Sequence, residues 1–451
     1  MNKVIITLLA LCSIFCSAQT IATGSHTLFL CVNGSARATG QNSFGQLGNG
    51  TTTNTVRPVD VSAVTDIIAV SGKGSHSLFL KSDGTVFASG SNVGGQLGIN
   101  STTDSNIPVQ VLGLTGIIKI AAGSGHSLFL KNDGTVWACG FNSFGQLGIG
   151  NFIRSNIPVQ IPNLSNVVAI ATGNLHSMFL KNDGTVQSCG RNNSGVLGIN
   201  STAPTTNTPV TVFISNVVAI AGGEFHSVFL KQDGTVWSCG SNDVGQSGQS
   251  AVNRLTPELI NNLTGISAIA TGNAHSLCLK NDGTVWSVGA GADGQLGDGT
   301  RLNKFTASQV LNVSNITEIG AGSNRSLFKK NDGTFFVCGS NAGSFGNGSN
   351  VSSDVPLQVA IGCALLSNPD FSKNQLTISP NPSTGILNIQ TENPITNANI
   401  TVADLNGRIV HETKAENLES KTLDLSNLQN GIYILNISNG ENKYSQKIIK
   451  Q

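Results

Sequence analysis

A unit of about 50 residues recurs seven times along most of this 451-residue chain, and this repetition constrains the fold more than any other feature. One histidine marks the same place in six copies, at intervals of 49 or 50 residues, and Arg325 takes that place in the seventh. The six histidines are His26, His76, His126, His176, His226 and His275. A fixed period of this length is typical of repeat architectures, in which each copy is one supersecondary unit.

Each copy has the pattern of a β-hairpin followed by two more strands. In the third copy the apolar residues 127–130 and the strand 135–138 flank an Asn-Asp-Gly turn at 132–134. Tight turns with positive φ need Asp, Asn and Gly, so the repeated aspartates require no catalytic explanation. A Gly-Gln-Leu-Gly loop at 145–148 follows, then a Pro-containing strand and an apolar strand. Four short strands per period predict an all-β, seven-bladed β-propeller.

The order Gly-His-Ser, apolar strand, Asp-Gly-Thr-Val, Gly, Asn and Gly-Gln-Leu-Gly resembles the repeat of the regulator of chromosome condensation (RCC1) family. The period alone is shared with kelch propellers, so the resemblance rests on the motifs, which recur in register from about residue 20 to 361. It implies a seven-bladed ring over 19–365 whose closing strand the sequence leaves open. The eukaryotic members act on a nuclear GTPase and chromatin, whereas some exported bacterial members capture or inhibit other proteins through one face of the ring.

Both ends of the chain carry export signals. Lys3, an apolar stretch over 4–15 and the small residues before Gln19 predict a Sec signal peptide over 1–18. No later segment reaches the length of apolar chain that a membrane span needs, so we expect no span. The chain is then expected to be secreted or attached to the outer surface of a bacterium.

The repeats end by residue 365, and an expected linker over 366–373 follows them. Residues 374–451 predict a small β-sandwich, and their Pro-Asn-Pro opening, Asp-Leu-Asn-Gly turn, 428–433 segment and basic tail look like the type A C-terminal sorting domain of the type IX secretion system. The resemblance implies contact with that secretion machinery, removal of this domain, and release or surface attachment. An ordinary carbohydrate-binding or spacer sandwich is the alternative.

Charge and cysteine content narrow the function further. Only 11% of residues are charged and the formal net charge is +1, which excludes the basic field that nucleic-acid binding requires. Four cysteines precede a Gly at equivalent points of their repeats and are expected to be small buried residues that are too far apart to pair. Cys31 and Cys363 fall in the first and last repeats and could form a disulfide that closes the ring.

Catalytic and cofactor motifs are missing from the sequence. We find no phosphate-binding loop, zinc-binding helix or nucleophile elbow, and carboxylates are sparse. The repeated histidines have no Asp, Glu or Cys beside them in each copy, so we interpret them as structural, where they help to fix their own blade, rather than as metal ligands. We therefore expect no catalytic residue, metal or cofactor, with a secreted hydrolase or lyase on one propeller face as the remaining enzymatic alternative.

Positions that change between copies are candidates for partner binding. They are the two residues before each histidine and the residue before each Gly-Gln-Leu-Gly loop, and they include Phe44, Phe144 and Phe225. Aromatic side chains on such loops suit protein or glycan capture, although each could instead pack against its own blade. We expect a monomeric binding module for an unknown protein or glycan; the alternative is a passive surface or adhesion scaffold.

Overall fold

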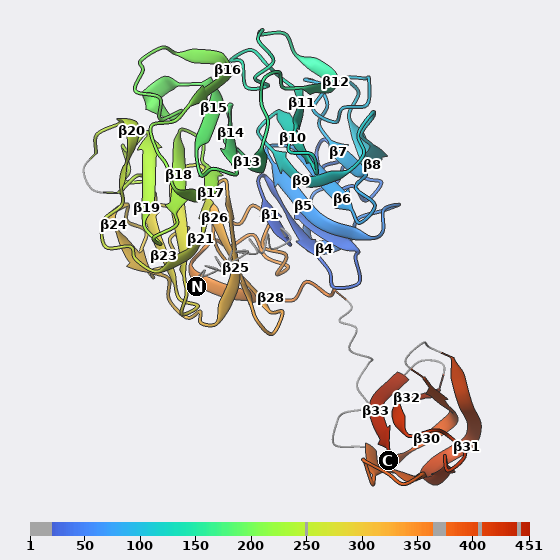
Figure 1. The fold of residues 1–451 in the computed structure, drawn as a ribbon. Helices are drawn as coiled ribbons and strands as arrows, with labels where there is room; N and C mark the ends of the chain where they lie inside the picture. The colour runs from blue at the N-terminus through green and yellow to red at the C-terminus, as the bar shows by residue number, and fades with distance from the viewer. Residues whose placement is uncertain (1–19, 249–250, 364–375, 405–407, 440–442) are drawn as a thin grey trace, which may run out of the picture. The chain divides into compact units, whose positions relative to one another are not determined.

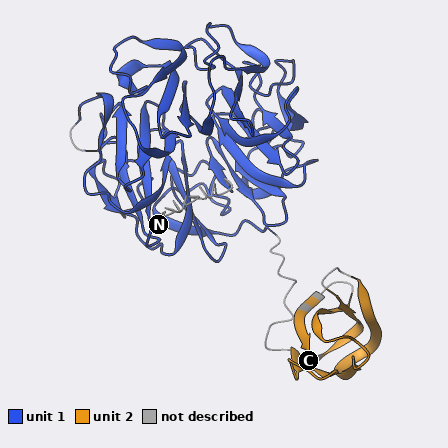
Figure 2. Ribbon diagram, viewed as in Figure 1, with its two compact units in different colours: residues 1–363 blue, residues 364–451 orange. Residues whose placement is uncertain are grey.

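The computed structural model describes residues 20–248, 251–363, 376–404, 408–439 and 443–451. The chain divides into two compact units, residues 1–363 and residues 364–451 (Figure 2). The expected signal peptide and the expected linker over 366–373 lie outside the described residues. Among the described residues no helix is long and apolar enough to cross a membrane.

The first unit is a ring of seven four-stranded antiparallel sheets (Figure 1). Each blade uses four consecutive strands, in their order along the chain from the centre outwards. The short helix η1 (Asn193–Gly195) follows the third strand of blade 4. The strands are β1 Ile21–Thr23, β2 His26–Leu30, β3 Ala36–Gly40, β4 Thr55–Asp60; β5 Ile67–Lys73, β6 His76–Lys81, β7 Val86–Gly90, β8 Ser105–Gln110; β9 Ile117–Ala122, β10 His126–Lys131, β11 Val136–Gly140, β12 Ser155–Gln160; β13 Val167–Thr172, β14 His176–Lys181, β15 Val186–Arg191, β16 Thr205–Thr211; β17 Val217–Gly222, β18 His226–Lys231, β19 Val236–Gly240, β20 Arg254–Leu259; β21 Ile266–Thr271, β22 His275–Lys280, β23 Val285–Gly289, β24 Lys304–Gln309; β25 Ile316–Gly322, β26 Arg325–Lys330, β27 Phe335–Gly339 and β28 Ser353–Val359.

The apolar cores of the ring lie between neighbouring blades. In β10, Leu128 and Leu130 pack with Phe179 of the following blade, whereas Phe129 packs with residues of the preceding one. Side chains alternate between the two faces of a strand, so a strand buried on both faces is apolar throughout. This explains why the second strand of every copy lacks the polar alternation of a half-exposed strand. Cys139 joins the same cluster as Phe129 and carries a free thiol.

In six of the seven blades, a glycine-bounded loop equivalent to Gly-Gln-Leu-Gly is held by an Asn that precedes it; blade 6 has Gly291 at this place. In blade 3 the Asn142 side chain accepts a hydrogen bond from Leu147 N at 2.9 Å and donates to the carbonyl oxygen of Ile153 at 3.1 Å. Leu147 is fully buried in the core, and Gly145 has a φ of 81° that side chains rarely adopt. The repeated motif therefore fixes the shape of a long loop, and its glycines serve backbone geometry.

The ring closes without exchange of a strand between the chain ends. Blade 1 is built wholly from β1–β4 and blade 7 from β25–β28, which answers the question that the sequence left open. Cys31 and Cys363, whose Cα atoms lie 5.4 Å apart, form a disulfide across this junction. Arg37 donates from Nη1 to the carbonyl oxygens of Ile361 and Gly362, at 2.7 and 2.9 Å. Covalent and side-chain contacts therefore join the two ends of the array.

The second unit is a five-stranded sheet in the order β29-β30-β32-β33, with β31 paired to β30. The long hairpin of β30 and β31 has a register shift between Gln390 and Ile395, and the sheet curls around one apolar core. An isolated bridge between Ser383 and Lys450 joins the last strand to the segment after β29. The strands are β29 Leu376–Ser379, β30 Ile386–Ala403, β31 Ile409–Asp424, β32 Gly431–Ser438 and β33 Lys443–Lys450.

Candidate functional site

One end of the propeller carries the turns before the repeated histidines and the long loops between third and fourth strands. In blade 3 these segments are 123–125, between β9 and β10, and 141–154, between β11 and β12. Because all strands of a blade are antiparallel, both segments lie at the same end. We call this end the loop face, and the opposite end, which carries the Asp-Gly turns, the turn face.

Each repeated histidine bonds to a serine of the next blade. His126 Nε2 lies 3.0 Å from Ser177 Oγ, and that hydroxyl donates to the carbonyl oxygen of Gln146 at 2.7 Å. The expectation that each histidine fixes its own blade was therefore wrong in its target, since the contact links neighbouring blades. The six pairs are His26–Ser77, His76–Ser127, His126–Ser177, His176–Ser227, His226–Ser276 and His275–Ser326.

These hydrogen bonds fix the protonation state of the imidazoles. The single hydroxyl proton of Ser177 is used on Gln146, so His126 must donate from Nε2, and its buried Nδ1 has no partner. Burial lowers the pKa of His126 to about 3 and that of His76 to about 4. Each Nε2 is engaged by a serine of the next blade, and the described residues contain no cluster of three or more His, Cys, Asp or Glu side chains suited to a metal.

Arg325 completes this belt in blade 7. Its guanidinium is buried and donates from Nη1 to the carbonyl oxygen of Gly24 at 3.0 Å and to Thr23 Oγ1 at 3.3 Å. The longer side chain reaches the backbone of blade 1, where the equivalent of the serine is Thr27. The departure from histidine therefore belongs to the closure of the ring and has no bearing on a ligand.

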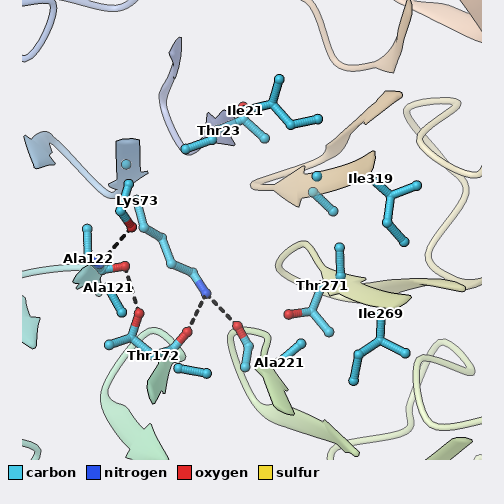
Figure 3. A pocket seen from close by; sticks show the side chains of 18 of the residues that line it. Ile21, Thr23, Lys73, Ala121, Ala122, Thr172, Ala221, Ile269, Thr271 and Ile319 are labelled. Carbon is cyan, nitrogen blue, oxygen red and sulfur yellow. Dashed lines mark hydrogen bonds between the residues drawn. The ribbon is translucent and has the colours of Figure 1, made fainter. Parts of the chain in front are cut away.

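The axis of the ring holds a cavity of about 320 Å³ lined by the innermost strands. Lys73 extends across it and donates from Nζ to the carbonyl oxygens of Gly222 at 2.6 Å and Thr172 at 3.3 Å (Figure 3). Burial lowers its pKa to about 8, against the opposing effect of Glu224. Five other blades have glycine at this place, so Lys73 is a single cross-link between blade 2 and blades 4 and 5.

The acidic side chain that lines the channel, Glu318, is also engaged. The Glu318 carboxylate accepts hydrogen bonds from the backbone and hydroxyl of Thr20, and Lys329 lies 3.9 Å away. The carboxylate ties the start of the chain to blade 7. The channel is thus lined mainly by aliphatic and small polar side chains, and its charged groups Lys73 and Glu318 are already bonded.

The three aromatic candidates lie in different settings on the loop face. Phe44 in blade 1 is 42% exposed. Phe144 and Phe225 are half-buried and enclose the guanidinium of Arg191, whose Cζ lies 5.4 and 5.1 Å from the two ring centroids. The structure therefore brings two of the three candidates together around a residue that we did not single out from the sequence.

A signal for Arg191 was present in the repeat. The residue directly after the last glycine of the third-strand motif is serine in three copies and a different residue in each of the other four. In blade 3 it is Phe141, whose ring occupies the space that Gly94 and Gly125 leave open, since a Cβ on either glycine would lie 2.5 or 2.6 Å from Phe141 Cδ2. This position therefore bridges adjacent turns and loops, and comparison of the copies would have placed it among the variable ones. The seven residues are Gln41, Ser91, Phe141, Arg191, Ser241, Ala290 and Ser340.

Further apolar side chains extend from the long loops. Each occupies the same place near the end of its loop, and each is between 64% and 73% exposed. Blades 1 and 2 carry threonine there. These exposed loop residues are Ile153, Val252, Leu302 and Val351.

Comparisons with known proteins bear on both units. Residues 108–379 match the family model described as the RCC1-like domain, residues 33–80 and 83–130 match the RCC1 repeat, and residues 377–451 match the secretion system C-terminal sorting domain. No curated protein sequence matches the chain.

Solved structures share the propeller. Human WBSCR16 is 25% identical with a TM-score of 0.61, over 68% of this chain and 85% of that one. Yeast RCC1 (Prp20), solved with Kap60, is 22% identical with a TM-score of 0.67, over 84% and 93%. Prp20p from Saccharomyces cerevisiae is 22% identical with a TM-score of 0.66, over 80% and 90%. The likeness to the yeast structures concerns the fold.

Proposed function

Because this chain belongs to the RCC1-like family and ends in a secretion-system sorting domain, we propose that it is an exported binding module that engages a protein through the loop face of its propeller. The sorting domain implies export to the cell surface or medium and contact with the type IX secretion machinery. The binding role is our inference from the surface of the ring.

The distribution of variable residues supports this role most strongly. Positions constant between copies are buried in the blade cores, the histidine belt and the loop anchors, or lie in the exposed Asp-Gly turns of the turn face. Positions that vary include Phe44 and Arg191 on the loop face, and the long loops of the same face expose Ile153 and Leu302. Aromatic residues and arginine are enriched among the side chains that dominate binding energy at protein interfaces.

Both ends of the ring expose apolar side chains, so the test must compare them. Val32 and Ile118 are exposed on the turn face. We expect the mature protein, immobilised and incubated with surface and secreted proteins, to retain a partner saturably. The triple variant Phe44→Ser, Ile153→Ser, Leu302→Ser should lose that partner, whereas Val32→Ser, Ile118→Ser should keep it.

The reverse pattern would move the binding surface to the turn face. Retention by neither wild type nor variants would leave a passive surface scaffold as the better description. A glycan array, run with the same proteins, separates the remaining alternative: saturable binding of a glycan in place of a protein would change the class of partner.

A further inference from the structure

Arg191 is a charged side chain without a counter-charge. Within the residues that the structure describes, its guanidinium forms no ion pair and no hydrogen bond, and its buried Nε has no partner. Of the six other arginines described in the propeller, five are engaged and Arg57 is exposed to solvent: Arg37 pairs with Asp60, Arg254 with Glu258, Arg301 with Asp354, Arg154 with the carbonyl oxygen of Val93, and Arg325 with that of Gly24. Arg191 therefore retains hydrogen-bonding capacity that the fold does not use.

Three blades hold the guanidinium in place. Phe144 comes from the long loop of blade 3, Arg191 ends β15 of blade 4, and Phe225 lies in the turn before β18 of blade 5. Their backbones are fixed by Phe144 N to Gln146 Oε1 at 3.0 Å, Arg191 N to Leu175 O at 2.9 Å, and Ser241 N to Phe225 O at 2.7 Å. A side chain stacked between rings on anchored backbone loses little conformational entropy when a ligand binds.

Only part of the Arg191 guanidinium is available to a ligand. The Cζ atom lies over both rings and Nε is buried, so the N–H edges that the two Nη groups form are left for an acceptor. A carboxylate matches those edges with two parallel, charge-assisted hydrogen bonds. Partial burial between two rings also makes such a pair stronger than an ion pair in open solvent.

The surroundings favour a single carboxylate over a polyanion. Glu224, next to Phe225, is engaged by Asn174 Nδ2 at 3.3 Å and interacts with Lys73, so the neighbouring acid is already in use. The net charge of +1 provides no extended basic field for a sulfated glycan or nucleic acid. Exposed Phe152 and Ile153 in the loop that carries Phe144 add apolar surface suited to a protein.

We propose that Arg191, stacked between Phe144 and Phe225, anchors one carboxylate of a protein partner, contributed by an Asp or Glu side chain that is flanked by apolar residues. This inference rests on the proposed binding function and names the group that its loop face recognises. It predicts a partner with an acidic residue at the centre of its contact surface.

The test uses the mature protein labelled with ¹⁵N-arginine and NMR of the arginine Nε–Hε groups. The Arg191 signal is assigned by its loss in Arg191→Lys. The two neighbouring rings should also shift its resonance away from those of the other arginines. The probes are the peptides acetyl-Leu-Glu-Leu-amide and acetyl-Leu-Gln-Leu-amide and a heparin hexasaccharide. We expect only the glutamate peptide to shift the Arg191 signal, and the exposed Arg57 signal to stay in place.

The same variants are then measured against any partner retained in the loop-face experiment. Arg191→Met keeps the apolar stem and should weaken binding about 10- to 100-fold, the usual range for a hydrogen-bonded charge. Arg191→Lys should rescue only part of this loss because it lacks the planar fork. Arg57→Met, the matched control on an exposed arginine without stacked rings, should bind like wild type. Equal thermal midpoints show that the variants are folded.

Several outcomes would overturn the inference. The first is that the glutamate peptide does not shift the Arg191 signal. The second is that the glutamine peptide shifts the signal as much as the glutamate peptide does, and the third is that only the heparin fragment shifts it. Full partner binding by Arg191→Met would also overturn it while leaving the binding function intact. Absence of any partner together with a shift specific to the glutamate peptide would instead count against the proposed function and retain the carboxylate site.

Discussion

At the scale of single residues, the repeated histidines show what a sequence pattern can and cannot reveal. The absence of acidic or thiol neighbours favoured a structural interpretation, and the structure pairs each histidine with a serine 50 or 51 residues later. That contact exists only after two blades have packed together. Arg191 is a similar case, because residues 47 and 34 positions away in the chain supply its aromatic neighbours.

The neutral histidine belt makes stability depend on pH. Burial depresses the pKa values of all six histidines, to about 3 for His26 and about 4 for His275. Between about pH 6.5 and those values the unfolded chain binds protons that the folded chain does not, so the free energy of unfolding must fall as pH falls. We expect urea midpoints to decrease steeply from pH 7 to pH 4.5, a window above the ordinary pKa values of Asp and Glu, which are about 3.9 and 4.3.

A variant isolates the histidine contribution. His226→Gln removes one titrating group, so its free energy of unfolding should fall with a slope shallower by up to about 1.4 kcal/mol per pH unit. The variant should be less stable at pH 7 because a flexible amide replaces the rigid ring that bonds Ser276 and packs over Gly223. A wild-type midpoint that stays constant down to pH 4.5 would contradict the belt of uncharged imidazoles.

At the scale of the blade, local sequence determines most of the structure. Asp-Gly turns and apolar runs correctly predicted four strands per repeat, because these signals act over a few residues. The turn before each histidine depends on tertiary contact as well. In four blades the imidazole lies over the glycine three residues earlier, where a Cβ would overlap its Cε1 atom; the glycines are Gly123, Gly173, Gly223 and Gly272.

This packing predicts the effect of one added methyl group. In Gly173→Ala the Cβ would overlap His176 Cε1 and approach the carbonyl oxygen of Gly223 at 2.5 Å, so the imidazole or the adjacent blade must move. We expect a loss of about 2–4 kcal/mol in the free energy of unfolding, comparable with overpacking of a core. Gly150→Ala, which has a φ of 82° and open space around it, should cost only about 1 kcal/mol. Equal losses in urea unfolding would show that His176 does not constrain the turn.

At the scale of the whole molecule, closure of the ring is the step that the repeat pattern leaves undetermined. The seven repeats predict seven blades, but they do not show how the first blade contacts the last. Here Phe29 packs edge-on against Phe335 with centroids 5.5 Å apart, Arg325 bonds to blade 1, and Cys31 is joined to Cys363. The bridge forms in oxidising compartments, in agreement with the export that the sorting domain implies.

The disulfide joins residues that are 332 positions apart in the sequence, so it should contribute substantially to the free energy of unfolding. Cross-links of long loops restrict the unfolded chain most, so Cys31→Ser, Cys363→Ser should lose about 2–5 kcal/mol of unfolding free energy. Because each blade packs mainly against its two neighbours, hydrogen exchange should rise first in β1 and β26 at the junction and least in β14 and β18 on blades 4 and 5. Dithiothreitol should lower the unfolding free energy of the wild type to that of the double variant, and it should leave the value for the variant unchanged. Uniform exchange around the ring, with no response to the reductant, would mean that the side-chain contacts of Phe29, Arg37 and Arg325 close the propeller without the bridge.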